Sequence, residues 1–260
     1  MTRNGSRFTW PDRGASAQQV LRWGFEEFGK GLGICTSFQA TGSVIVHMAA
    51  KQVGADARVF SIDTGRLHEE SYQLIEEYRR RYGITVQLIG PDADELGSML
   101  TRHGPNLFYE EPAKRKLCCE IRKVRPLRRR LATLDAWITG LRRDQDPSRA
   151  SVNKVTVDEE HGGIIKIAPL ADWSSAEVFE YARRHDVPLH PLYERGYPSI
   201  GCQPCTRPSK PGEGARSGRW WWETGVDKEC GMHVRGDGSV RRDFDILLDQ
   251  ILPSRKPYLA

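Results

Sequence analysis

Short apolar runs alternate with longer amphipathic segments along most of the chain. Five runs have the length and apolar content of buried strands, at residues 33–37, 58–62, 84–89, 136–139 and 164–168. Apolar residues recur at helical spacing elsewhere, which predicts helices at 16–28, 44–51, 69–82, 120–131 and 174–184. Strands that alternate with helices indicate an α/β fold, a doubly wound parallel sheet covered on both faces. Ligands of such sheets bind beyond the carboxyl ends of the strands.

The pattern changes at about residue 193. Glycine, proline, arginine and tryptophan dominate the segment that follows, and no regular periodicity persists until a last apolar stretch at 244–252. Such a segment is too poor in apolar residues to build its own core, so a metal, a ligand or the main domain must hold it. We therefore expect an α/β domain at 1–193 and an irregular C-terminal segment at 194–260.

The composition fits one globular core and no membrane span. Hydrophobic residues make up 38% of the 260 residues, and mean hydropathy is −0.56. No run approaches the roughly 18 apolar residues that a transmembrane helix needs. The first residues contain no apolar signal sequence, so we expect a cytoplasmic protein. The net charge of +5 is too balanced for a histone-like protein and leaves a small anionic substrate and nucleic acid both open.

Polar residues follow the first two predicted strands, at the edge where a ligand is expected. Hydroxyl groups and glycine between a strand and a helix suit a phosphate, because free backbone N–H groups and the helix dipole point there. The second strand ends in Asp63-Thr64-Gly65-Arg66, and a guanidinium at that place suits a phosphate or sulfate. Ordinary βα turns are the alternative for both loops, and there is no Walker A motif. The candidate binding residues here are Thr36, Ser37, Phe38, Gln39, Asp63, Gly65 and Arg66.

The six cysteines of the chain are more typical of metal ligands or catalytic thiols than of disulfides. Cys202 and Cys205 form a C-x-x-C pair, which is compatible with zinc, a redox dithiol or an iron–sulfur site. Cys118 and Cys119 are adjacent, a spacing that structural zinc sites do not use. Because four thiolates also complete the ligand set of a [4Fe–4S] cluster, we favour a cluster over zinc. The role of Cys35, in a predicted buried strand, is open.

Cationic residues accompany these cysteines. Residues 114–130 contain nine basic residues against one acid. A solvated helix face is the usual meaning of such a run, but Lys123 falls one helical turn from the vicinal cysteines. A metal site with anion-binding groups beside it is the more specific interpretation. Arg142 and Arg143 add a further pair directly after the fourth predicted strand.

Two further motifs lie in the C-terminal segment. Arg216 and Arg219 are spaced to hold a doubly anionic group, and the tryptophans at 220–222 must pack on the main domain or a partner. Packing and surface charge are the alternative for this motif. Cys230 lies three residues before His233 and two after a lysine, surroundings that lower a thiol pKa and favour a nucleophile. The adjacent glutamate opposes that shift, and an inert cysteine is the alternative.

Taken together, these residues resemble the assimilatory sulfonucleotide reductases, specifically the adenosine 5′-phosphosulfate (APS) reductases. The resemblance covers nearly the whole chain and is carried by the cysteine quartet, the R-x-x-R-W-W-W-E motif from Arg216 and the E-C-G-M-H segment around Cys230. It implies an adenine-nucleotide α-hydrolase-like fold, a [4Fe–4S] cluster on the quartet and usually a homo-oligomer. It also implies that Cys230 attacks the sulfur of APS and that AMP leaves. Thioredoxin, or a glutaredoxin-like dithiol protein, then releases sulfite from the S-sulfocysteine.

The charge of APS assigns further roles within this resemblance. Its phosphate and sulfate need cationic partners, and stabilisation of the leaving AMP is expected to be the largest catalytic contribution. The expected partners are Lys123, Arg142 or Arg143, Arg216, Arg219 and His233. The resemblance implies that the cluster carries no electrons but orders the C-terminal segment and polarises the site through Lys123. The first loop lacks an acidic residue often found in the family, so the individual adenosine contacts stay open.

Three other functions compete with this one. A 3′-phosphoadenosine 5′-phosphosulfate (PAPS) reductase or a dual-specificity enzyme would use the same chemistry, although PAPS reductases typically lack the quartet. A tRNA-thiolating enzyme also combines a nucleotide loop with a cluster, but it would carry an S-G-G-x-D-S loop that is missing here. A zinc-stapled nucleotide-binding module would not need Cys230. We therefore expect an enzyme with APS as substrate, with neither a nucleic acid nor a membrane as partner.

Overall fold

Six strands form one sheet in the computed structural model, which describes residues 10–12, 14–223 and 239–252. The strand order is β3-β2-β1-β4-β6-β5, and every pairing is parallel except that of β5 with β6. The predicted α/β class with a mainly parallel sheet is confirmed. The strands are β1 Leu32–Cys35, β2 Val59–Ile62, β3 Val86–Ile89, β4 Ala136–Ile138, β5 Val155–Asp158 and β6 Ile164–Ile167.

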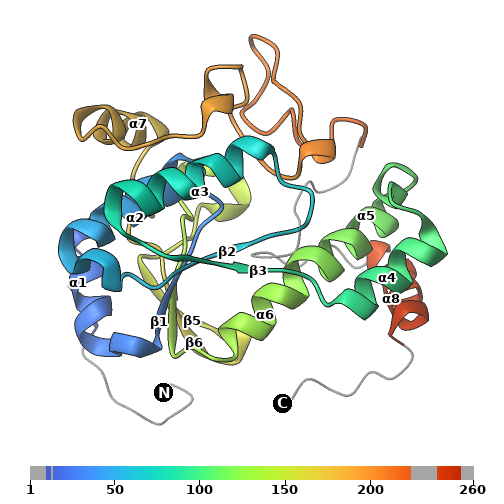
Figure 1. Cartoon of the computed structure of the whole chain (residues 1–260), viewed down its shortest axis with the longest axis horizontal. Helices are drawn as coiled ribbons and strands as arrows, with labels where there is room; N and C mark the ends of the chain where they lie inside the picture. Colours follow the sequence, from blue (N-terminus) through green and yellow to red (C-terminus); the bar gives the residue numbers. More distant parts are fainter. Residues whose placement is uncertain (1–9, 13, 224–238, 253–260) are drawn as a thin grey trace.

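Helices cover both faces of this sheet, as a doubly wound fold requires (Figure 1). Because side chains alternate along a strand, Ile34 and Ile138 face a core built with α1, α2, α3 and α7. Phe60 and Trp137 point the other way, against α6. The helices are α1 Ala17–Phe28, α2 Ala40–Val53, α3 Glu69–Tyr82, α4 Ala93–His103, α5 Pro112–Cys119, α6 Arg125–Leu131, α7 Ser175–Arg184 and α8 Ser239–Ile251.

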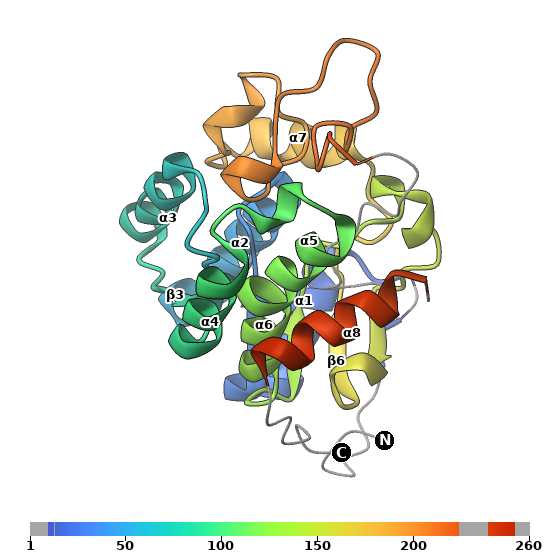
Figure 2. The same cartoon turned by 90° about the vertical axis from the view of Figure 1, so that its right-hand side faces the viewer.

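A second apolar core joins the C-terminal segment to the main domain. The buried side chains of Leu248 and Ile251 on α8 belong to one cluster with Leu117 of α5 and the four quartet cysteines. Figure 2 shows α8 lying beside α5 and α4, although α8 is far from both helices in the sequence. Trp220 is fully buried in the same cluster. Packing on the main domain is therefore what holds the described part of this segment.

The structure corrects two of the predicted elements and adds helix α4 to them. Helix α2 begins at Ala40 rather than at 44, because Gln39 is the extended N-cap residue and its carbonyl already accepts from Ser43 N. The predicted helix at 120–131 continues from α5: its first five residues, Glu120–Val124, form a π turn, and α6 completes it. Helix α4 was not predicted, although Asp92 caps it by accepting from two backbone N–H groups.

Strand β5 was also not predicted. It is an edge strand whose first three residues are only half-buried, so it lacks the apolar signal of the central strands. None of the helices in the described ranges is both long and apolar enough to cross a lipid bilayer.

Candidate active site

A cavity of about 310 Å³ lies at the carboxyl edge of the sheet, between β1 and β4. Here the order of the strands reverses, from β3-β2-β1 on one side to β4-β6 on the other. The loops that follow β1, β2 and β4 form its walls, together with segments 198–202 and 215–220. This is where open α/β sheets bind ligands, so the sheet topology and the cavity identify the same site.

The loop after β1 is shaped by close contacts. Thr36 Oγ1 accepts from Phe38 N at 2.9 Å, and a Cβ atom at position 42 would lie 2.3 Å from the same oxygen, so glycine is required there. Gln39 Oε1 accepts from Ile200 N at 2.9 Å and ties the loop to the C-terminal segment. Thr36, Ser37 and Gln39 line the cavity. Phe38 has φ +54°, and its buried ring packs on Tyr78 in the core.

The residues of the loop after β2 have different roles. Asp63 Oδ1 accepts from Gly65 N at 2.8 Å and from Tyr72 Oη at 2.9 Å, so it fixes the turn. Gly65 has φ +66°, which favours glycine. Arg66 points away from the large cavity, donating to Pro105 O at 2.7 Å and lining a smaller cavity with the cysteines.

Cationic side chains dominate the large cavity. Its lining includes Lys123, Arg142, Arg149, Arg216 and Arg219. Asp144 is the one carboxylate among the described lining residues, so the cavity is suited to a ligand with several negative charges.

The structure separates the two arginines that follow β4. Arg142 is buried in the cavity wall, whereas Arg143 is exposed and donates through Nε to Val152 O at 2.8 Å. Arg149 was missed by the sequence analysis because nothing in its local pattern distinguishes it from other surface arginines. It donates to Gln145 Oε1 at 2.5 Å and lines the cavity from the same loop.

Arg219 and Trp220 line the large cavity from the C-terminal segment. The Trp220 ring is enclosed by two guanidinium groups, with Arg115 Cζ 4.6 Å and Arg219 Cζ 4.7 Å from its centroid. Such cation–π contacts are strongest where water is excluded, and Trp220 is fully buried. Trp222 packs on Tyr109, whereas Trp221 is more exposed. The predicted packing of the tryptophans on the main domain is confirmed for Trp220 and Trp222.

A buried ion pair fixes the end of this segment to α5. Arg115 Nε and Nη2 donate to the two carboxylate oxygens of Glu223 at 2.9 and 3.0 Å, and both side chains are almost completely buried. We expect Glu223→Ala to lower the free energy of unfolding by about 3–5 kcal/mol, because it leaves a buried guanidinium without this carboxylate. Chemical denaturation measures the loss. Glu110→Ala, which removes an exposed partner of Lys114, is the control and should cost under about 1 kcal/mol; equal losses would contradict the prediction.

The four quartet cysteines come together around the smaller cavity. Cys118 and Cys119 end α5, and Cys202 directly precedes a short 3₁₀ turn, Gln203–Cys205, of which Cys205 is the last residue. All four are buried and none forms a disulfide. Within the described residues, no group of three or more histidine, cysteine, aspartate or glutamate side chains converges closely enough to hold a single metal ion.

Cations stabilise negative charge on this thiol cluster. Burial alone would raise the pKa of Cys202, but Lys123, the Thr64 hydroxyl 3.3 Å away and Arg219 lower it below its ordinary value. Burial raises the pKa of Cys205 to about 12 and also raises that of Cys118. Lys123 and Cys202 line both cavities, so the thiol cluster and the anion site are direct neighbours.

Two cysteines of the chain, Cys35 and Cys230, do not belong to the quartet. Burial raises the pKa of Cys35 to about 12, which keeps it a neutral thiol at physiological pH. Cys230 and His233 lie outside the described residues. The last described residue before them is Glu223, which the ion pair with Arg115 holds at the smaller cavity's edge.

Residues 32–208 match the family model of the phosphoadenosine phosphosulfate reductase domain. The chain belongs to this family. The matched span contains the sheet, the loops after β1 and β4 that line the large cavity, and the complete cysteine quartet. The recognition made from the sequence motifs is therefore confirmed.

Named members of the family share much of the chain. An adenosine 5′-phosphosulfate reductase of Burkholderia cepacia is 47% identical over 199 residues, which is 76% of this chain and 79% of that protein. One of Allochromatium vinosum is 41% identical over 227 residues, 87% of this chain and 88% of its own. The crystal structure of a phosphoadenylyl-sulfate (PAPS) reductase from Candida auris in complex with phosphate superposes with a TM-score of 0.64 at 30% identity. That superposition covers 75% of this chain and 91% of the other.

Proposed function

We propose that this protein reduces APS to sulfite and AMP, with Cys230 as nucleophile and a dithiol protein of the thioredoxin class as reductant. The observation that carries the proposal is the polycationic cavity at the point where the strand order of the sheet reverses. This cavity shares Lys123 and Cys202 with the smaller cavity that is lined by the four buried cysteines. The relatives named APS reductase, at 41% and 47% identity, support APS as the substrate.

The reaction balances as two displacements at sulfur. The Cys230 thiolate attacks the sulfur of the sulfate group, an S–S bond forms, and the S–O bond to AMP breaks with its electron pair on AMP. A thiolate of the reductant then attacks Cys230 Sγ and expels sulfite with the electron pair. The second reductant thiol resolves the mixed disulfide, so the dithiol is oxidised and the Cys230 thiol is restored.

The cationic side chains bind the phosphosulfate and stabilise the leaving phosphate. Charge builds up on AMP as the S–O bond breaks, and preorganised guanidinium groups stabilise it without reorganisation. Arg142, Arg149, Arg216 and Arg219 surround the cavity where this charge would develop, and Lys123 faces it from the thiol side. His233 is a further candidate for the sulfate, by the resemblance alone.

We further propose that Cys118, Cys119, Cys202 and Cys205 hold a [4Fe–4S] cluster. The fit is chemical: four buried thiols line one cavity together with Arg66, Arg115, Arg122 and Lys123, whose charges suit an anionic cluster. The four cysteine thiolates would complete the ligand set of such a cluster. When bound, the cluster supplies order to the C-terminal segment and polarises the anion site.

The choice between APS and PAPS is tested by turnover. With reduced thioredoxin, we expect sulfite and AMP to form from APS with a kcat/KM well above that for PAPS. Thiols that must stay reduced also support a cytoplasmic location. A preference for PAPS would overturn the substrate assignment while keeping the chemistry, and failure with both nucleotides would overturn the proposed function.

The role of Arg219 is testable through its neighbour Gly201. A Cβ atom at position 201 would lie 2.2 Å from Arg219 Nη2 and 2.4 Å from Cζ, so Gly201→Ala must displace the guanidinium, which is the flexible end of its side chain. We expect the affinity for AMP to fall by roughly tenfold or more, which is the loss expected when one charge-assisted hydrogen bond is removed. Gly214→Ala, with nothing within 4 Å, is the matched control. Equal AMP affinity in both variants, measured by calorimetry, would contradict the role.

A further inference from the structure

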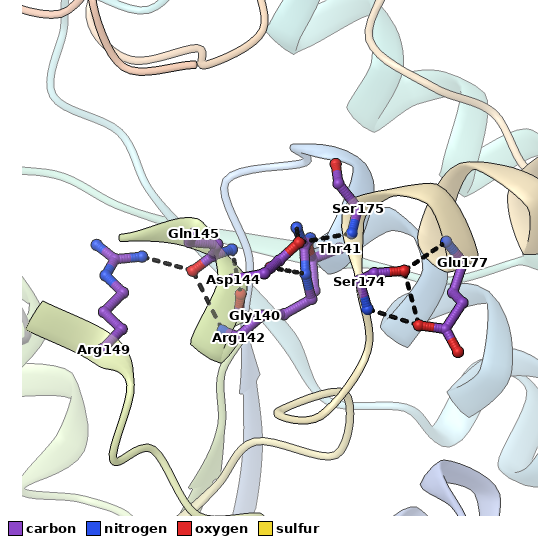
Figure 3. Close-up of polar contacts among 9 residues, drawn as sticks. All are labelled: Thr41, Gly140, Arg142, Asp144, Gln145, Arg149, Ser174, Ser175 and Glu177. Carbon is purple, nitrogen blue, oxygen red and sulfur yellow. Dashed lines mark hydrogen bonds and ion pairs between the residues drawn. The ribbon is translucent and has the colours of Figure 1, made fainter. Parts of the chain in front are cut away.

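We propose that Asp144 is a positioning residue that anchors the Arg142 guanidinium to the start of helix α7. The proposal rests on the proposed function of the cavity, because it concerns how the phosphate of APS or AMP is held. Figure 3 shows Asp144 between Arg142 on one side and the first residues of α7 on the other.

The guanidinium of Arg142 is fixed at both ends. Its Nε donates to Asp144 Oδ1 at 2.9 Å and its Nη2 to Asp144 Oδ2 at 3.2 Å, a two-point contact that sets the plane of the group. Nη1 donates to Thr41 Oγ1, in the first turn of α2. A guanidinium has five N–H donors, and these contacts within the described residues use three. The others are available to an anion at the start of α2.

The carboxylate of Asp144 is itself anchored. Its Oδ2 accepts from Ser175 N at 2.6 Å, the first backbone N–H of α7, which has no acceptor within the helix. The positive end of the helix dipole also favours a carboxylate at this place. Asp144 therefore holds the Arg142 guanidinium at a fixed place relative to α7, in addition to neutralising its charge.

Helix α7 is a firm support because its own cap is complete. Ser174 Oγ accepts from Glu177 N at 3.2 Å, and Glu177 Oε2 accepts from Ser174 N at 2.7 Å. This capping box satisfies the backbone N–H groups of Ser174 and Glu177 without Asp144. The contact from Ser175 N is thus an addition to a helix start that is already stable.

A purely competitive role for Asp144 predicts the opposite result. If its carboxylate only competed with the substrate phosphate for Arg142, its removal would free the guanidinium and tighten anion binding. If it positions Arg142, removal lets a long side chain sample other rotamers, and binding weakens. The sign of the change in AMP affinity therefore separates the two roles.

Ser175→Pro removes the anchoring N–H without breaking the helix. Proline is favoured at the first helical position, and the preceding Ser174 is extended at φ −77° and ψ 163°, as a residue before proline should be. The proline ring would occupy the place of the N–H hydrogen, so the Asp144 carboxylate must move. Ser175→Ala keeps the N–H and loses only the hydroxyl, and it is the matched reference.

The test measures AMP binding by calorimetry and APS turnover in the full-length, metal-loaded protein. We expect AMP to bind about fivefold more weakly to Ser175→Pro than to Ser175→Ala, and about tenfold more weakly to Asp144→Ala than to the unaltered protein. Asp144→Asn should lie between, because it keeps an acceptor for Ser175 N. KM for APS should rise more than kcat falls, since substrate and product share the phosphate. In an Arg142→Ala background, Asp144→Ala should have no further effect.

Each result decides the matter. Unchanged or tighter AMP binding in Asp144→Ala, or an undiminished effect of that change without Arg142, would overturn the positioning role. If the unaltered protein binds AMP and the variants weaken it as expected but no APS is reduced, the proposed function fails and the positioning role stands. If the unaltered protein does not bind AMP, both are overturned.

Discussion

Incubated with APS and no thiol reductant, the protein is expected to gain the mass of one SO₃ group, and the Cys230→Ser variant to gain none. The reason is the order of the two displacements: AMP leaves when the S–S bond forms, and only a reductant thiolate can remove the sulfite. Intact-protein mass spectrometry measures the adduct, and chromatography measures one AMP released per chain. Turnover with thioredoxin should be abolished in the variant.

Cys35→Ser is the control for this experiment. Burial raises the pKa of Cys35 to about 12, so it does not supply a thiolate and its variant should still gain the SO₃ group. If the Cys230→Ser variant gained the SO₃ group and the Cys35→Ser variant did not, the assignment of Cys230 as the nucleophile would be contradicted. The same incubation with PAPS compares the two nucleotides in a single step, independently of any reductant.

The sequence predicted the parts of the fold that carry strong local signals. The central strands are short, apolar and bounded by turns, and all five predicted strands are present in the sheet. Strand β5 was missed because an edge strand buries little, and α4 because Met99 is its one fully buried side chain. The start of α2 was set too late because Thr41, Gly42 and Ser43 read as a turn, although tertiary packing holds all three in the buried first helical turn.

The site could be predicted only as far as its motifs reach. Arg142 is the extended residue that precedes a 3₁₀ turn and Arg143 is the first residue of that turn, and of the two only Arg142 lines the cavity. Which one depends on the sheet register and on α7, neither of which the motif contains. Arg149 and the anchoring of Asp144 are likewise tertiary features. The two cysteine pairs are 84 residues apart, from Cys118 to Cys202, and the packing of the C-terminal segment on α5 brings them together.

The Cys202→Ser variant is expected to lose most of its iron and its APS turnover. Lys123, the Thr64 hydroxyl and Arg219 act against burial to lower the pKa of Cys202, so this buried thiol is prepared to bind iron as a thiolate. Serine has a far higher pKa and is a poor ligand for iron. Since Cys202 lines both cavities, losing the cluster there should also weaken AMP binding.

Iron and acid-labile sulfide analysis, with the visible absorption spectrum, tests this expectation. The unaltered protein should contain four iron and four sulfide per chain, as the cluster requires. Cys35→Ser changes a cysteine outside the quartet and should retain the full complement, which controls for the loss of any one thiol. One zinc per chain in the unaltered protein, or a fully loaded and active Cys202→Ser, would refute the ligand set. If the Cys202→Ser variant kept its iron but lost AMP binding, Cys202 would instead belong to the anion site alone, because this residue lines both cavities.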